Sequence, residues 1–139
     1  MEDESLADKY DKMLEKFFTG GLDLEIKMRE EELRHPQLAI DENIGGSRAQ
    51  NKRSYSVENT MVKIESDETL NKLKEQRRAI VETIKTFDRE HNEVVSQHYR
   101  QRISWDMIAT LHFTDRRTVI RWRDEFKDYL LSWNRSIFD

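Results

Sequence analysis

The sequence predicts an all-α fold, and three observations support that prediction. The 139-residue chain has one proline and only four glycines, too few turn formers for the many loops of an all-β protein. Apolar residues recur at helical spacing through most of the chain. Hydrophobic residues make up 36% of it and charged residues 37%, which favours solvated helices around a thin core. We expect an N-terminal helical hairpin, an irregular linker, a long helix and a C-terminal pair of helices.

The first 35 residues predict an acidic helical hairpin. Apolar side chains lie at helical spacing in residues 5–18 and, less regularly, in residues 23–34. The Gly-Gly pair at 20–21 separates these helices. Pro36 ends the second one, because the residue before a proline is driven out of the α region. The segment carries eleven acidic and six basic residues, so we expect it to serve in partner interaction or oligomerisation.

Residues 36–55 are the least regular part of the chain. They contain the only proline, the second Gly-Gly pair and three bases, Arg48, Lys52 and Arg53. Two interpretations remain open: a linker, or a basic arm that contacts nucleic-acid phosphates or folds on a partner.

Residues 56–139 predict one helical domain. A short helix is expected at 56–64 and a longer one at 68–87, whose polar middle either protrudes or pairs with a partner. Asp88 is a suitable N-cap for a third helix that ends near Tyr99, since its carboxylate can accept an unpaired amide of the first turn.

The last forty residues predict a helix-turn-helix at about 104–131. Ser104 can cap a helix WDMIATLH, in which the small Ala109 allows a neighbouring helix to cross closely. Thr114 can cap the helix that follows. This layout inserts one helix into the DNA major groove. The predicted core-facing stripe of that helix consists of Val119, Trp122, Phe126, Tyr129, Leu130 and Trp133.

The opposite face of this helix carries arginine, which can make paired hydrogen bonds to guanine. Docked by its N-terminal half, the helix would present Arg116, Arg117, Ile120 and Arg121 to the bases. Thr118 can reach a base or a phosphate, and Ile120 a thymine methyl. The predicted phosphate contacts are Arg100, Arg102, Arg123 and Lys127.

Charge is distributed unevenly along the chain. The formal net charge is -4, but residues 98–127 carry seven bases and four acids. DNA responds to the local field within about 10 Å at ordinary salt, so the basic end can bind phosphate despite the acidic total.

At the residues of the predicted helix-turn-helix, the chain resembles the phage-encoded late-gene transcriptional regulators of the ArpU and RinA kind. These proteins end in a helix-turn-helix like region 4 of bacterial sigma factors. The resemblance spans about residues 40–133. It rests on NIGGSRAQ at 43–50, SVENTMVKI at 56–64, residues 68–87, and a W-x-x-I-A pattern followed by R-T-V-x-R-W. It implies an activator that binds double-stranded promoter DNA with host RNA polymerase, in the cytoplasm of the bacterial host. It also implies that the recognition-helix contacts are Arg116, Arg117, Thr118, Ile120, Arg121 and Arg123.

The turn departs from the family pattern, which commonly reads I-A-x-x-L-G-I-S-x-x-T-V. Here Ile108-Ala109 is followed by TLHFTDRRTV, without the glycine and with the leucine one position early. Either a residue is inserted or the turn is of another type, so which of Arg116 and Arg117 faces the bases stays open.

Other classes of function are less well supported. The chain has no cysteine, and its histidines and carboxylates are not spaced for a metal site. No glycine loop suits a phosphate, and no apolar run is long enough to cross a membrane. We therefore expect no enzyme, no cofactor and no membrane. The alternatives are a small terminase-like DNA-packaging protein and a helical scaffold protein. Both a homodimer and a monomer beside a sigma factor remain open.

Overall fold

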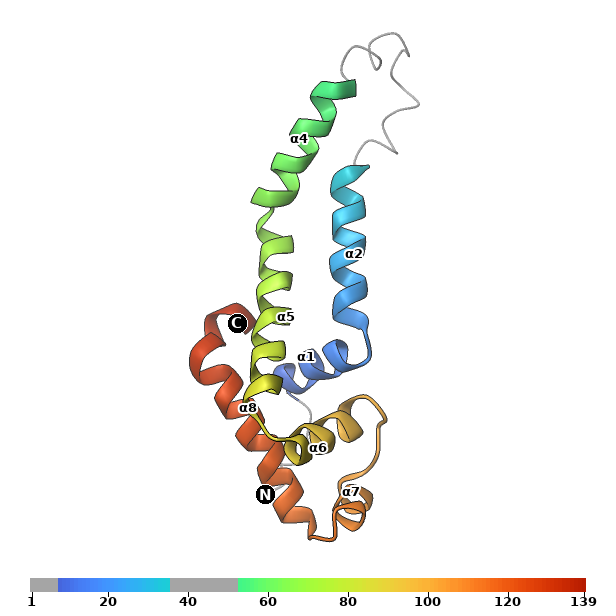
Figure 1. Ribbon diagram of the computed structural model, residues 1–139, viewed down its shortest axis with the longest axis vertical. Coiled ribbons are helices and arrows are strands. Elements are labelled where there is room, and N and C mark those ends of the chain that lie inside the picture. The colour runs from blue at the N-terminus through green and yellow to red at the C-terminus, as the bar shows by residue number, and fades with distance from the viewer. Residues whose placement is uncertain (1–7, 36–52) are drawn as a thin grey trace. The chain divides into compact units, whose positions relative to one another are not determined.

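A computed structural model describes residues 8–35 and 53–139, in which every regular element is an α-helix (Figure 1). In chain order these are α1 (Lys9–Phe18), α2 (Gly21–Arg34), α4 (Arg53–Ser66), α5 (Glu68–Thr86), α6 (Arg89–Tyr99), α7 (Trp105–Leu111) and α8 (Arg116–Phe138). The predicted all-α fold is confirmed. Most of the predicted linker or basic arm, with Arg48 and Lys52, lies outside the described residues, and Arg53 opens α4.

The described residues form two compact units. The larger unit contains residues 8–23 and 75–139, and the smaller unit contains residues 24–35 and 53–74. This division differs from the predicted one, in which residues 1–35 formed an element of their own. Helix α1 belongs instead with the C-terminal helices, because it places a buried leucine and a buried aspartate among them.

In the smaller unit, an arginine–aspartate pair joins α2 to the start of α5. Arg29 donates to Asp67 from Nε (3.0 Å) and Nη2 (2.7 Å), the two-point geometry that suits a guanidinium and a carboxylate. Asp67 also accepts the backbone N–H of Leu70 at 2.8 Å. The hydrogen bonds from Arg29 hold the pKa of Asp67 below its usual value. This unit exposes four large apolar side chains, those of Leu24, Met28, Met61 and Val62.

In the larger unit, α1 begins with a reciprocal cap. The Asp8 carboxylate accepts the backbone N–H of Asp11 at 2.9 Å, and the Asp11 carboxylate accepts that of Asp8 at 3.0 Å. Leu14 is completely buried on the inner side of the helix. The chain leaves α1 through Gly20, whose φ of 87° is a conformation that glycine adopts without steric cost.

The core of the larger unit lies where α6, α7 and α8 meet and where α1 packs on α6 (Figure 1). Phe18 of α1 stacks on Tyr99, with ring centroids 6.2 Å apart, and approaches Phe126 at 6.5 Å. The predicted cap of α6 is confirmed, since Asp88 accepts the backbone N–H of His91 at 2.9 Å.

The last turn of α8 returns to α5. The helix is interrupted at Asn134, which has non-helical φ and ψ of -134° and 20°, and Phe138 beyond it is buried. The buried side chain of Gln76 donates to the carbonyl of Ile137 at 2.9 Å. The part of α5 expected to protrude is thus covered at Gln76 by the C-terminal turn.

The buried face of α8 differs from the predicted one. Val119, Phe126 and Leu130 are buried as expected, but Trp133 is 77% exposed and Tyr129 is also exposed. At 3.6 residues per turn, the buried face is rotated by roughly 70° from the predicted stripe. Three residues outside that stripe are buried instead: Ile120, Arg123 and Leu131.

Candidate nucleic-acid interface

Helices α7 and α8 form the predicted helix-turn-helix. Ser104 caps α7 by accepting the backbone N–H of Met107 at 3.2 Å, as its position predicted. A cluster of buried apolar side chains holds the two helices together on α6: Val94, Trp105, Ile108, Ala109, Val119 and Ile120. The first turns of α8 are therefore seated on a packed core.

The turn between the helices is a Schellman motif without glycine. Phe113 N–H donates to the carbonyl of Thr110 at 3.2 Å, and Thr114 N–H to that of Ala109 at 2.9 Å, the two bonds that define the motif. Phe113 has a φ of 57°, at the left-handed position where glycine is usual. Asp115, and not Thr114 as predicted, caps α8.

No residue is inserted in this turn. Residues 108–119 have the same length as the pattern I-A-x-x-L-G-I-S-x-x-T-V, with Ile-Ala and Thr-Val at the two ends. His112 occupies the leucine position, nearly buried, with Nε2 2.9 Å from Oε1 of Gln97. Phe113 occupies the glycine position and Asp115 the serine position. The departure concerns residue type alone, so the register of α8 follows the pattern.

Three arginines at the start of α8 are exposed to solvent. Arg117 and Arg121 are four residues apart and share the outer face of the helix. Arg116 lies to one side, with Nε 3.4 Å from the carboxylate of Asp106 on α7. Arg121 Nε lies 3.9 Å from Glu125. Exposed ion pairs of this kind contribute little to stability, so base edges or phosphates can replace the two acids.

Three predicted contacts are not on this surface. Ile120 is only 2% exposed and belongs to the core, so the prediction that it meets a thymine methyl is wrong. Arg123 is only 4% exposed, so its predicted DNA contact is wrong as well. The ammonium of Lys127 lies 3.2 Å from both Asp8 and Asp11, so it is already occupied by carboxylates.

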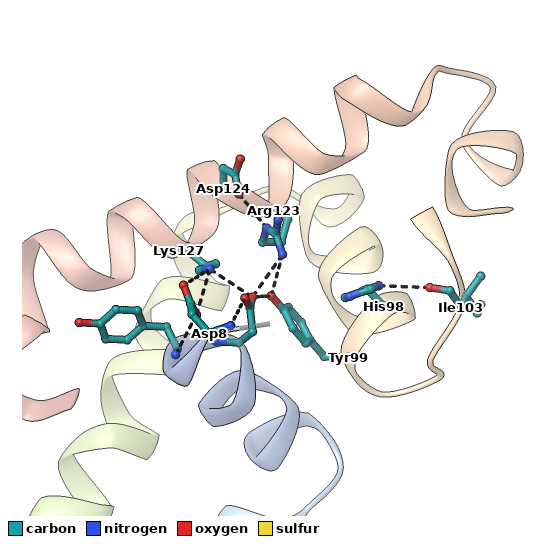
Figure 2. Close-up of polar contacts among 9 residues, drawn as sticks. Asp8, His98, Tyr99, Ile103, Arg123, Asp124 and Lys127 are labelled. Atoms are coloured by element: carbon teal, nitrogen blue, oxygen red, sulfur yellow. Dashed lines mark hydrogen bonds and ion pairs between the residues drawn. The ribbon is translucent and has the colours of Figure 1, made fainter. Parts of the chain in front are cut away.

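A buried polar cluster joins α1, α6 and α8, as Figure 2 shows from one side. Arg123 donates to the Asp11 carboxylate at 3.2 Å, to the Tyr99 hydroxyl at 3.4 Å and to Asp124 at 2.7 Å. The Tyr99 hydroxyl donates to Asp11. The guanidinium carbon also lies 5.0 Å from the ring centre of Trp105, within the range of a cation–π interaction. The cluster thus fixes α8 to α1 from within.

The pKa shifts of Arg123 and Tyr99 show which groups of the cluster are charged. Desolvation opposes the charge on Arg123, but its contacts with Tyr99 and Asp11 outweigh that effect and raise its pKa. Desolvation and the Asp11 charge raise the pKa of the Tyr99 phenol well above its usual value. Arg123 therefore stays charged and Tyr99 stays a hydrogen-bond donor.

Two predicted phosphate contacts precede α7. Arg100 and Arg102 are both exposed, and Arg102 lies 3.3 Å from Glu15 of α1. Arg102 also has a positive φ, of 58°. Both side chains are therefore accessible, and the acid beside Arg102 belongs to an exposed, exchangeable pair.

Comparison with known proteins identifies the family. A family model described as "Protein of unknown function (DUF722)" matches residues 6–132. The chain belongs to the DUF722 family. No curated protein and no solved structure matches it. The match begins before α1 and ends within α8, so the DUF722 region contains the buried cluster as well as the helix-turn-helix.

Two further findings concern the described part of this DUF722 chain. None of its helices combines the length and apolar content needed to cross a membrane. No three histidine, aspartate or glutamate side chains there are arranged to hold a metal ion.

His98 supports the helix-turn-helix core of the DUF722 chain from α6. Its ring stacks on Trp105, with centroids 3.7 Å apart, and its Nδ1–H donates to the carbonyl of Ile103 at 3.2 Å. Burial lowers the pKa of His98 below 6.5. The unfolded chain therefore takes up a proton more readily than the folded one, so the contribution of His98 to stability is present above pH 6.5 and is lost as the pH falls below that value.

We expect His98→Asn to weaken this pH dependence. Asparagine keeps a donor for Ile103 but does not titrate, so the free energy of unfolding should change less between pH 6.5 and about pH 5 than it does in the wild type. Urea denaturation at several pH values measures both slopes. Equal slopes would show that His98 is not the group responsible.

Sequence reasoning missed Asp11 and Tyr99. Asp11 is an acid on the face that carries Leu14 and Phe18, three and seven residues further on, and a charge inside an apolar stripe was the available signal. Its partner Arg123 lies 112 residues away, so nothing local indicated that the two would pair.

Proposed function

We propose that this protein is a sequence-specific DNA-binding transcriptional regulator that places the first turns of α8 in the major groove of a promoter duplex. One observation carries the proposal: a packed helix-turn-helix core presents Arg117 and Arg121 together on the outer face of its second helix. Recognition helices of this class contact base edges with their N-terminal residues.

The structure supports a division of roles among the exposed arginine side chains. Arg117 and Arg121 are assigned to base edges, because paired hydrogen bonds from arginine to guanine are the commonest specific contact. Arg116, drawn aside toward Asp106, and Arg100 and Arg102 are assigned to phosphates, which position the protein on the duplex.

The proposal extends to the biological setting through the resemblance to phage late-gene regulators. The protein would bind a late promoter as an activator and act with the host RNA polymerase. The exposed apolar side chains of the smaller unit are compatible with a homodimer. Light scattering would distinguish a dimer from a monomer.

Selection from a library of randomised duplexes tests the proposal. The wild-type chain should recover a common sequence and bind it at physiological salt at least about 1,000-fold more tightly than a scrambled duplex of the same composition. Equal affinity for the two duplexes would leave only nonspecific binding, and no measurable affinity for either would exclude DNA as the ligand.

A further inference from the structure

Phe113 is an aromatic side chain that the fold itself does not use. It is 96% exposed, and its φ of 57° lies where a Cβ atom is disfavoured. Among the described non-glycine residues, only Phe113 and Arg102 have a positive φ, and they lie on either side of α7. Glycine would fit the position of Phe113 without strain, so the phenylalanine costs the fold strain at its backbone and, being exposed, gains no burial in return.

The surroundings of Phe113 favour DNA as its partner. It precedes the N-cap of α8 by two residues, and the exposed, positively charged Arg116 and Arg117 follow directly after that cap. These charges complement a polyanion. Met107 and Leu111 of α7, six and two residues before Phe113, are also about half exposed.

We infer that Phe113 contacts the C5-methyl group of a thymine in the major groove, next to the bases that α8 reads. This inference rests on the proposed function and adds a specificity-determining residue to it. Phenylalanine is among the side chains that make apolar contact with that methyl group. Such a contact replaces the thymine contact expected of Ile120, whose side chain is buried in the core. The target sequence then contains a thymine at the edge of the site.

Removing the methyl group from the DNA tests the contact without changing the protein. The duplex recovered by selection is synthesised with each thymine replaced in turn by deoxyuridine. At one position, wild-type affinity should fall about fourfold, the effect of burying one group of methyl size. Phe113→Gly should weaken binding to the unmodified duplex at least as much, and should bind the deoxyuridine duplex no more weakly than the unmodified one.

Thermal melting supplies the second readout. Phe113→Gly should melt at the same temperature as the wild type or higher, because glycine relieves the strain at φ 57°. Phe113→Asn, which tolerates the left-handed region, serves as a second variant with the same expected loss of affinity. A lower melting temperature for Phe113→Gly would show that the ring supports the fold, and would overturn the inference.

The outcomes separate this inference from the proposed function. If the wild type prefers its selected duplex but no deoxyuridine substitution weakens binding, the thymine contact is excluded while sequence-specific binding stands. If Phe113→Gly binds the selected duplex as tightly as the wild type, Phe113 contacts something other than DNA, such as a protein partner. If the wild type shows no preference among duplexes, the function and the inference both fail.

Discussion

Replacement of Asp11 by asparagine is expected to lower the free energy of unfolding by about 3 kcal/mol, in the range found when one partner of a buried ion pair is removed. Asparagine keeps the shape of the side chain but removes the negative charge that faces both Arg123 and Lys127. Two cations would then remain close together, with Asp8 and Asp124 as their remaining acids. Denaturant unfolding followed by circular dichroism measures the loss.

The Asp23–Arg77 pair provides the matched control. It joins the first turn of α2 to α5 at 2.6 Å, but both side chains are about half exposed, so Asp23→Asn should change stability little. Combining Asp11→Asn with Arg123→Met should cost less than the sum of the two single changes, because the buried charges are then removed together. If Asp11→Asn costs no more than Asp23→Asn, the buried cluster does not hold α1 to α8.

The second large effect is expected on DNA binding. Arg117→Ala and Arg121→Ala should each weaken binding to the selected duplex by about tenfold or more, as for the loss of a paired hydrogen bond to guanine. Both residues are exposed, so the melting temperature should stay within about two degrees of the wild type. Fluorescence anisotropy with a labelled duplex at fixed salt measures the affinities.

Arg78→Ala is the control for these variants. Like Arg121, Arg78 is an exposed arginine of the larger unit paired with a glutamate on its own helix, Glu75 at 2.8 Å. It lies on α5, away from the helix-turn-helix in the sequence, and its loss removes the same charge. If Arg78→Ala weakens specific binding as much as Arg121→Ala does, the effect reflects net charge, and the assignment of Arg121 to base edges is wrong.

The local features of the fold could be predicted because each depends on neighbouring residues. Ser104 and Asp88 cap their helices by accepting an amide three residues further along, so short sequence windows contain the whole interaction. The all-α class followed from spacing and from the scarcity of glycine and proline in the same way.

The orientation of α8 could not be predicted, because it depends on a distant residue. Hydropathy assigned Trp133 to the core and Arg123 to the surface, and the structure exposes Trp133 and buries Arg123. Burial of an arginine requires a partner, here Asp11 of α1, and no pattern within α8 contains that partner. The pair with Asp11 accounts for the burial of Arg123. The apolar cluster formed with α6 and α7 accounts for that of Ile120.

The turn shows a different limit. The missing glycine and the unchanged length of residues 108–119 are both visible in the sequence, but the sequence alone did not give the type of turn. The hydrogen bonds of Phe113 and Thr114 show a Schellman motif in which a phenylalanine occupies the left-handed position.

Methylation interference on the selected duplex tests most directly the claim that α8 enters the major groove. Guanine N7 lies in the major groove and adenine N3 in the minor groove. We predict that N7-methylation of one or more guanines in the site blocks wild-type binding, that Arg121→Ala loses the interference at one of them, and that N3-methylation of adenine has no effect there. Interference at adenine N3 alone, or at no base of the site, would contradict the account.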